Sequence, residues 1–146
     1  ILRKRCRPVE VITPKTLQLL DDMAETMRAA QGVGLAAPQV GILRRIVVIE
    51  VEEGNLIELI NPKIIAYAGE QIGTEGCLSV PGIWGITDRP EKVTVRATGI
   101  DGRKFEVTGE GLLARAFCHE LDHLDGKLFT DNAVHILTKK ELEELA

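Results

Sequence analysis

Three absences narrow the classes of protein to which this sequence can belong. The chain of 146 residues has no basic excess, with 18 Lys and Arg against 22 Asp and Glu and a net charge of −4. We therefore expect no direct binding of nucleic acid. It has no apolar run near the ~20 residues that a membrane-spanning helix needs, so no membrane association is expected. It also has no recognisable signal peptide.

The sequence also lacks a set of cysteines that could all pair. Its three cysteines are Cys6, Cys77 and Cys118, and their spacing does not repeat. An odd count argues against a secreted disulfide scaffold, and reduced cysteines in a cytoplasmic setting fit better. The chain begins with Ile1 rather than Met. We therefore expect that an N-terminal segment is missing, and a removed organelle leader is one possible form of it.

Internal repeats, low-complexity tracts and Gly/Ser linkers are absent as well. The length is usual for one domain and is enough for a real core. The content of 45% hydrophobic and 27% charged residues is ordinary for a globular protein. We therefore expect one catalytic domain over residues 1–146.

Two helices are predicted from apolar periodicity and end signals. The first covers residues 13–30, where Thr13 can cap the helix and Pro14 suits its first turn. It should end at the glycines of residues 32–34. The second covers residues 110–126, has apolar residues at helical spacing, and should end at Gly126. A short helix is also expected over residues 138–146.

Strands are predicted between the two long helices. Residues 44–51 read as a buried strand, and residues 56–69 as two strands divided at Asn61-Pro62. Residues 92–109 read as a hairpin that turns at Asp101-Gly102. This order, without a regular strand–helix alternation, predicts an α+β fold with largely antiparallel sheets.

The second predicted helix contains the sequence CHELDH. On a helix His119 and His123 lie roughly 40° apart and one turn from each other, so both imidazoles can bind one ion. Glu120 follows at about 60° beyond His123. This is the arrangement of His-Glu-x-x-His zinc hydrolases, in which the Glu is the general base. The alternative is a solvated helix that carries two histidines. The apolar neighbours favour a buried helix, in which unpaired histidines would be unfavourable.

A catalytic metal site of this type needs a third protein ligand. His135 lies in an ordinary-looking stretch, and Cys6 lies in a polar one. Cys118 points about 100° away from His119 and is better explained by packing. Cys77 is the better candidate, because glycines around it let the backbone come close to another group. These are Gly73, Gly76 and Gly82.

Residues 31–41, QGVGLAAPQVG, form a loop of small residues with one polar side chain, Gln39. The stretch is not a phosphate-binding loop, since it has no Gly-Lys-Ser/Thr and does not open a helix after a strand. One interpretation is a tight connection with an exposed Gln. The other is a narrow wall along a substrate, where the Gln39 amide donates to a polarised carbonyl oxygen.

Three stretches together resemble the peptide deformylase family. They are GVGLAAPQ (32–39), EGCLS (75–79) and HELDH (119–123), in the family's order. The resemblance implies a metal bound by Cys77, His119 and His123, with Glu120 as catalytic acid/base. It implies removal of the formyl group from the N-terminal formyl-methionine of new polypeptides, and antiparallel sheets around a central metal-binding helix. The implied metal is Fe²⁺, with Zn²⁺, Ni²⁺ or Co²⁺ able to replace it.

Further roles follow from the motifs and the resemblance together. Gln39 and the backbone N–H of Leu78 would stabilise an oxyanion. The substrate backbone could pair with Val33, Gly34 and Gly76 as an added strand. Leu112 and the alkyl part of Arg115 are expected to line the pocket for the methionine side chain. Trp84 is expected at the entrance of this pocket, and the alternative for Trp84 is simple core packing. Val33 is a further candidate for that pocket.

Support for the ligands is expected from a buried charged network of Glu75, Arg89 and Asp122, because ligating groups need orientation. Two other functions compete with the deformylase hypothesis. A metallopeptidase or other amidase would usually use a distant Glu or His as its third ligand. A structural metal site or inactive peptide-binding module would not need Glu120 and Gln39. The expected partners are formylated nascent polypeptides, with the ribosome a possible docking partner for the C-terminal tail.

Overall fold

The computed structural model describes residues 4–77, 80–127 and 133–136, and for residues 80–84 and 133–136 it describes the backbone alone. Within these ranges the chain forms helices α1 and α2, the 3₁₀ helix η1, and strands β1 to β8. Their bounds are α1 Pro14–Ala29, β1 Gly34–Ala36, η1 Ala37–Val40, β2 Ile46–Ile49, β3 Ile57–Ala68, β4 Gln71–Cys77, β5 Val80–Arg89, β6 Lys92–Thr98, β7 Lys104–Glu110, α2 Leu112–Leu124 and β8 Ala133–Ile136. The helix expected over residues 138–146 lies outside the described residues.

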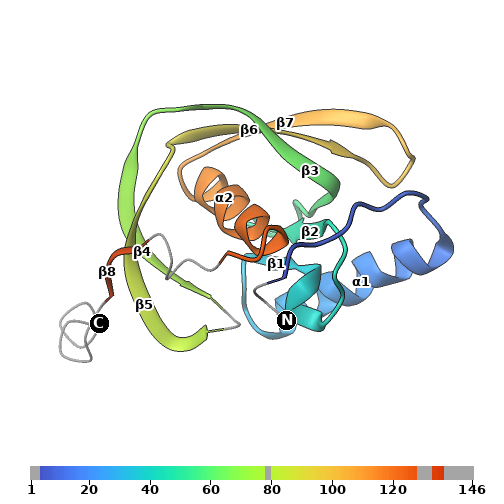
Figure 1. Ribbon diagram of the computed structural model, residues 1–146, viewed down its shortest axis with the longest axis horizontal. Helices are drawn as coiled ribbons and strands as arrows, with labels where there is room; N and C mark the ends of the chain where they lie inside the picture. Colours follow the sequence, from blue (N-terminus) through green and yellow to red (C-terminus); the bar gives the residue numbers. More distant parts are fainter. Residues whose placement is uncertain (1–3, 78–79, 128–132, 137–146) are drawn as a thin grey trace.

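Two antiparallel sheets surround helix α2. The larger has the strand order β1-β2-β3-β6-β7, and the smaller has the order β4-β5-β8. Figure 1 shows the larger sheet curving over α2 and the smaller sheet beside it. All strand pairs are antiparallel. The predicted α+β fold with a central helix is confirmed.

Helix α1 begins as its sequence predicts. Thr13 and Thr16 form a reciprocal capping box, which satisfies free N–H groups of the first turn, and Pro14 opens the helix. Its C-terminus differs from the prediction. The helix ends at Ala29, and the left-handed backbone conformation that follows belongs to Gln31, at φ 57°, rather than to a glycine.

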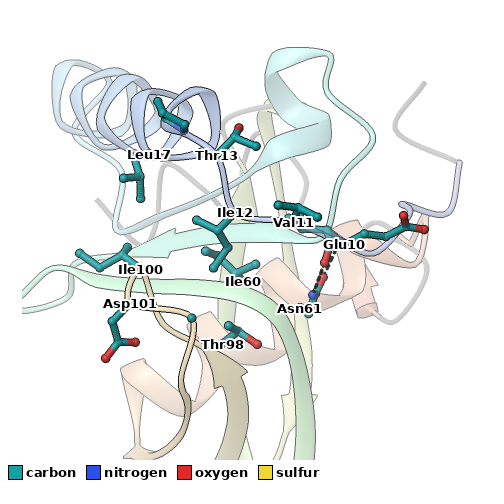
Figure 2. Close-up of a pocket in the computed structure, with 13 residues that line it drawn as sticks. Glu10, Val11, Ile12, Thr13, Leu17, Ile60, Asn61, Thr98, Ile100 and Asp101 are labelled. Atoms are coloured by element: carbon teal, nitrogen blue, oxygen red, sulfur yellow. Dashed lines mark hydrogen bonds between the residues drawn. The ribbon is translucent and has the colours of Figure 1, made fainter.

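Strand β3 is continuous where two strands were predicted, so the division at Asn61-Pro62 is wrong. The pairing of β3 with β6 shifts register between Ile60 and Lys63, and Asn61 has φ 52°. Such a bulge accommodates a proline, which has no N–H for the ladder. The Asn61 amide is held by Val9: it accepts from the Val9 N–H at 2.7 Å and donates to the Val9 carbonyl at 2.8 Å. Figure 2 shows Asn61 in a surface groove under the start of α1.

The predicted hairpin is present as β6 and β7. The two strands pair from Lys92 opposite Glu110 to Thr98 opposite Lys104. The turn places Gly102 at φ 81°, where its N–H donates to the Gly99 carbonyl at 3.0 Å. A glycine adopts this backbone conformation without steric strain, which is why the sequence signal was reliable here.

The core consists of two apolar clusters, one on each face of β2. Val47 and Ile49 pack with Phe117 of α2, while Ile46 and Val48 pack with Met27 of α1. Successive residues of a strand point to opposite faces, so the two helices cover opposite sides of the larger sheet. This packing fixes α2 against β1 and β2. Among the described residues, none of the helices has the length and apolar character needed to cross a membrane.

Candidate metal centre

Both histidines of the HELDH sequence lie on the buried face of α2. The helix ends at Leu124, with Gly126 at φ 75° just beyond it, so the predicted C-terminal stop is confirmed. His119 and His123 are almost fully buried, and their ring centroids lie 5.0 Å apart at an interplanar angle of 74°. The neighbouring Cys118 lies in the apolar cluster instead, where burial raises the pKa of its thiol to about 11.

Cys77 brings the third donor atom to the two imidazoles. One donor atom each from Cys77, His119 and His123 lie within 4.8 Å of one another. The Cys77 Sγ is 3.1 Å from Nε2 of His123. Cys77 is the last residue of strand β4, and its partner in β5 is Val80, three residues further along the chain. Gly73, on the same strand, provides space, because a Cβ atom there would lie 3.1 Å from Nη2 of Arg115.

Glu120 is buried beside this group of donors. Its Oε1 has no hydrogen-bond partner among the described residues. Its Oε2 faces the backbone of β1, and a Cβ atom on Gly34 would lie only 2.6 Å from it. Burial raises the pKa of Glu120 to about 7, although the charge of His119 acts in the opposite direction. A carboxyl group with such a pKa can accept and return a proton near neutral pH.

Gln39 approaches the same site from η1. Its Oε1 accepts from the Ala36 N–H at 2.9 Å, and its Nε2 lies 3.6 Å from the Cys77 Sγ. The side chain is half-buried. Of the two interpretations of the Gly-rich loop, this geometry favours the wall beside a reaction site over the exposed Gln.

A buried polar network lies behind His119. Glu75 Oε1 accepts from Nδ1 of His119, and Arg89 Nη2 donates to the same oxygen at 2.8 Å. Arg89 Nη1 donates to Asp122 Oδ2 at 2.7 Å. The three charged residues predicted to form a network are therefore joined. The sequence did not predict that Thr87 and the guanidinium of Arg115 also bind Glu75. The spacing of Arg115 four residues before His119 was the available signal, since it places both on one face of the helix.

These contacts shift the pKa values of the two histidines in opposite directions. Burial lowers the pKa of His123 to about 4. Burial also disfavours the charged form of His119, but Cys77, Glu120 and Glu75 outweigh it and raise its pKa to about 10. Glu75 is opposed by burial too, yet His119 and Arg89 hold its pKa well below the usual range.

The donor set fits a metal ion. Thiolate and imidazole groups bind zinc and iron well, and three protein ligands leave one position for water or substrate. Glu75 accepts the Nδ1 proton of His119, which would leave Nε2 free to coordinate, as carboxylates do for many metal-bound histidines. Glu120 follows His119 directly on α2, and its buried Oε1 has no hydrogen-bond partner among the described residues, so it is free to accept a proton.

The other predicted site residues are placed as follows. Val33 and Leu112 are partly exposed, at 40% and 53%. Gly76 lies in β4, opposite Trp84 in β5, whose side chain is outside the described part. Leu78 lies outside the described residues. Two weaker ligand candidates lie elsewhere: Cys6 is buried beside the end of α2, and His135 lies in β8.

Comparison with known proteins gives consistent matches over nearly the whole length of the chain. The model of the polypeptide deformylase family matches residues 1–139. The peptide deformylase of Caldanaerobacter subterraneus is 57% identical over 143 residues, covering 98% of this chain and 89% of that protein. That of Acetivibrio thermocellus is also 57% identical over 143 residues, covering 98% and 84%.

Solved structures agree with these relatives. A peptide deformylase from Legionella pneumophila has a TM-score of 0.87 at 43% identity, covering 99% of this chain and 88% of its own. A peptide deformylase from Synechococcus elongatus in complex with actinonin has a TM-score of 0.87 at 41% identity, covering 98% and 77%.

An α+β scaffold that gathers two imidazoles, a thiol and a buried carboxyl group is typical of a mononuclear metal-dependent hydrolase. The sequence and structure matches then define the family. The chain belongs to the polypeptide deformylase family, and as such it is an amidohydrolase that acts on linear amides.

Proposed function

We propose that this chain removes the formyl group from the N-terminal formyl-methionine of newly synthesised polypeptides and releases formate. The observation that carries the proposal is the buried Glu120 carboxyl group beside three donor atoms that lie within 4.8 Å of one another. Family membership supports the substrate. The actinonin complex of the Synechococcus relative supports an accessible site in that enzyme.

The proposed ligands are Cys77, His119 and His123, and the proposed physiological metal is Fe²⁺, with Zn²⁺, Ni²⁺ or Co²⁺ as substitutes. When bound, the metal would act as a Lewis acid toward the attacking water and the formyl oxygen. Glu75 would keep His119 in the tautomer that coordinates through Nε2. The neutral form of His123, favoured by its lowered pKa of about 4, is the form that can coordinate.

Glu120 would move the proton. Its carboxylate removes a proton from the attacking water, and the resulting carboxylic acid passes that proton to the departing amine. The pKa of about 7 suits both steps, because neither form is strongly favoured near neutral pH. Gly34 lets β1 approach the carboxyl group closely and limits where Oε2 can lie.

Gln39 and Leu78 would stabilise the oxyanion that forms as water attacks. Ala36 already holds the Gln39 oxygen, which turns the amide NH₂ toward Cys77 and away from the backbone. The backbone N–H of Leu78 follows Cys77 directly in the sequence. Removing one such donor typically lowers the rate about 10²–10³-fold.

The substrate backbone would bind as an added strand. In the described part of the sheets, β1 and β4 are both edge strands, so one side of each is available for pairing. Val33, Gly34 and Gly76 lie at these edges. The methionine side chain would contact Val33, Leu112 and the alkyl part of Arg115, with Trp84 at the entrance. We further propose a cytoplasmic location and docking of the protein on the ribosome.

An assay of the protein purified without oxygen, combined with metal analysis, tests this proposal. A formyl-Met dipeptide should be hydrolysed to formate, and the matching acetyl-Met dipeptide should react far more slowly. A peptide with only an internal bond to cleave provides the comparison with a metallopeptidase. Preference for either competitor over the formyl substrate would contradict the proposed function.

A further inference from the structure

Helix α2 packs its apolar side chains against the larger, five-stranded sheet and not against the smaller one, among the described side chains. Among the described side chains, the cluster that contains Phe117 and Leu124 draws its strand residues from the five-stranded sheet. No described side chain of β4, β5 or β8 belongs to either apolar cluster. The smaller sheet nevertheless carries Cys77, whose position relative to His119 and His123 decides whether one ion can reach all three.

Polar contacts of Arg115 connect α2 to that smaller sheet. Its Nη1 donates to Glu75 Oε2 at 2.9 Å and also to the Thr87 hydroxyl. Its Nη2 donates to the carbonyls of Gln71 at 3.3 Å and Thr87 at 3.4 Å. The side chain is almost fully buried, and Gly73 leaves the space in which the guanidinium lies. One helix residue therefore contacts both β4 and β5.

The bonds to Glu75 are divided between its two oxygens. Arg115 and Thr87 donate to Oε2, whereas His119 donates to Oε1. Holding Oε2 fixes the plane of the carboxylate and so the direction in which Oε1 meets the imidazole. The Arg89 side chain contacts both oxygens and also Asp122 of α2, but Arg89 belongs to β5, where its backbone pairs with Gln71 of β4, and the only described bonds of its side chain to β4 are those to Glu75.

We propose that Arg115 is a positioning residue for the metal centre. It holds the strand that carries Cys77 against the helix that carries the histidines, and through Glu75 it fixes the ring of His119. This role rests on the proposed function only in that the three donors are taken as metal ligands.

Metal affinity of the metal-free protein tests this role without an activity assay. Arg115→Lys keeps the charge but cannot reproduce the planar fork of bonds. We expect it to lower Co²⁺ affinity, measured by competition with a chelator, by about 10- to 100-fold. The visible spectrum of bound Co²⁺ should change as the donor geometry loosens. The matched control is Arg96→Lys, which alters an exposed ion pair with Glu106 on β6 and β7 and should leave both readouts unchanged.

Gly73→Ala provides a second test if Arg115→Lys does not fold. The added Cβ would lie 3.1 Å from Nη2 of Arg115, so it should displace the guanidinium without removing it and reduce Co²⁺ affinity in the same direction. Unchanged Co²⁺ affinity and spectrum in Arg115→Lys, or in Gly73→Ala, would overturn the role of Arg115. A wild-type protein that binds Co²⁺ but does not deformylate would contradict the proposed function alone.

Discussion

At the scale of single residues, adjacent positions of one helix have different environments. His119 belongs to the group of donor atoms and contacts Glu75, while Cys118, directly before it, lies among apolar side chains. Each helical step turns the side chain by about 100°, which is enough to move a thiol from a metal-binding position into the core. The raised pKa of Cys118, about 11, keeps this thiol protonated and unreactive near neutral pH.

Substituting the two cysteines separately should distinguish these environments. Cys77→Ala removes one of the three proposed ligands, so metal affinity should fall by more than the about 10- to 100-fold expected for losing a ligand's hydrogen-bond partner. Little metal should therefore remain bound after purification. Cys118→Ala should keep its metal, because its thiol lies outside the donor group. Metal analysis of both proteins checks this, and normal metal content in Cys77→Ala would exclude that residue as a ligand.

Glu120→Gln should separate chemistry from metal binding. The amide cannot take a proton from water, so turnover of a formyl-Met peptide should fall by about 10²–10⁴-fold. The metal content should be unchanged, because Glu120 is not among the three donors. Steady-state kinetics of the metal-loaded variant provides the measurement, and full turnover would rule out Glu120 as the general base.

At the scale of elements, the close approach of β1 to α2 restricts where the Glu120 carboxyl group can lie. Gly34→Ala would bring a Cβ atom to 2.6 Å from Glu120 Oε2, so the carboxyl group must shift. A displacement of about 1 Å can lower a rate roughly 10²-fold. We expect a loss of kcat on that order with metal content retained. A variant with wild-type kcat would show that this contact does not position Glu120.

The elements also show how far the sequence alone can predict the fold. Helix α1 and the hairpin of β6 and β7 have local signals, the Thr13 cap and the Asp101-Gly102 turn, and both are present. Strand β3 was misread because Asn61-Pro62 is a local break signal, whereas its long-range pairing with β6 keeps the strand continuous through a bulge. The pairing of strands that are distant in the sequence cannot be predicted from any short stretch of residues.

The candidate metal centre shows the same difference between local sequence signals and long-range contacts. HELDH predicted two adjacent imidazoles and a carboxyl group because a helix fixes their relative directions. The Arg115 guanidinium could not be placed in this way. Its spacing identifies its helix face, but the strand opposite that face depends on how the whole chain folds.

At the scale of the whole molecule, buried charge joins the two sheets through α2 and makes stability depend on pH. Because the folded-state pKa of Glu75 is lowered, its ionisation stabilises the fold above the unfolded value of about 4.3. That contribution is lost as pH falls toward the lower folded value, since the unfolded chain binds the proton first.

Glu75→Gln in the metal-free protein should therefore be less stable than wild type at pH 7, and the difference should shrink at pH values of about 3. Urea unfolding at both pH values measures the free energy of unfolding. An equal difference at the two pH values would indicate that the ionisation of Glu75 does not contribute in this way.

Metal addition should stabilise the folded chain as a whole, because its proposed ligands come from both α2 and β4. A ligand that binds only the folded state at 100 times its Kd adds about 2.7 kcal/mol to the free energy of unfolding. Thermal unfolding of the metal-free protein with and without Co²⁺ or Zn²⁺ should therefore show an increase in Tm. The increase should be absent in Cys77→Ala, and its persistence there would argue for binding elsewhere.

The distribution of the donors along the chain also sets the order of events during synthesis. Cys77 is translated roughly forty residues before His119. A nascent chain therefore carries this thiol for a time without its histidine partners, and no shorter product that stops before His123 can assemble the group of donors. We therefore expect that a metal ion bound by these donors is acquired only after α2 has emerged and folded, which would make metal loading a late event in maturation.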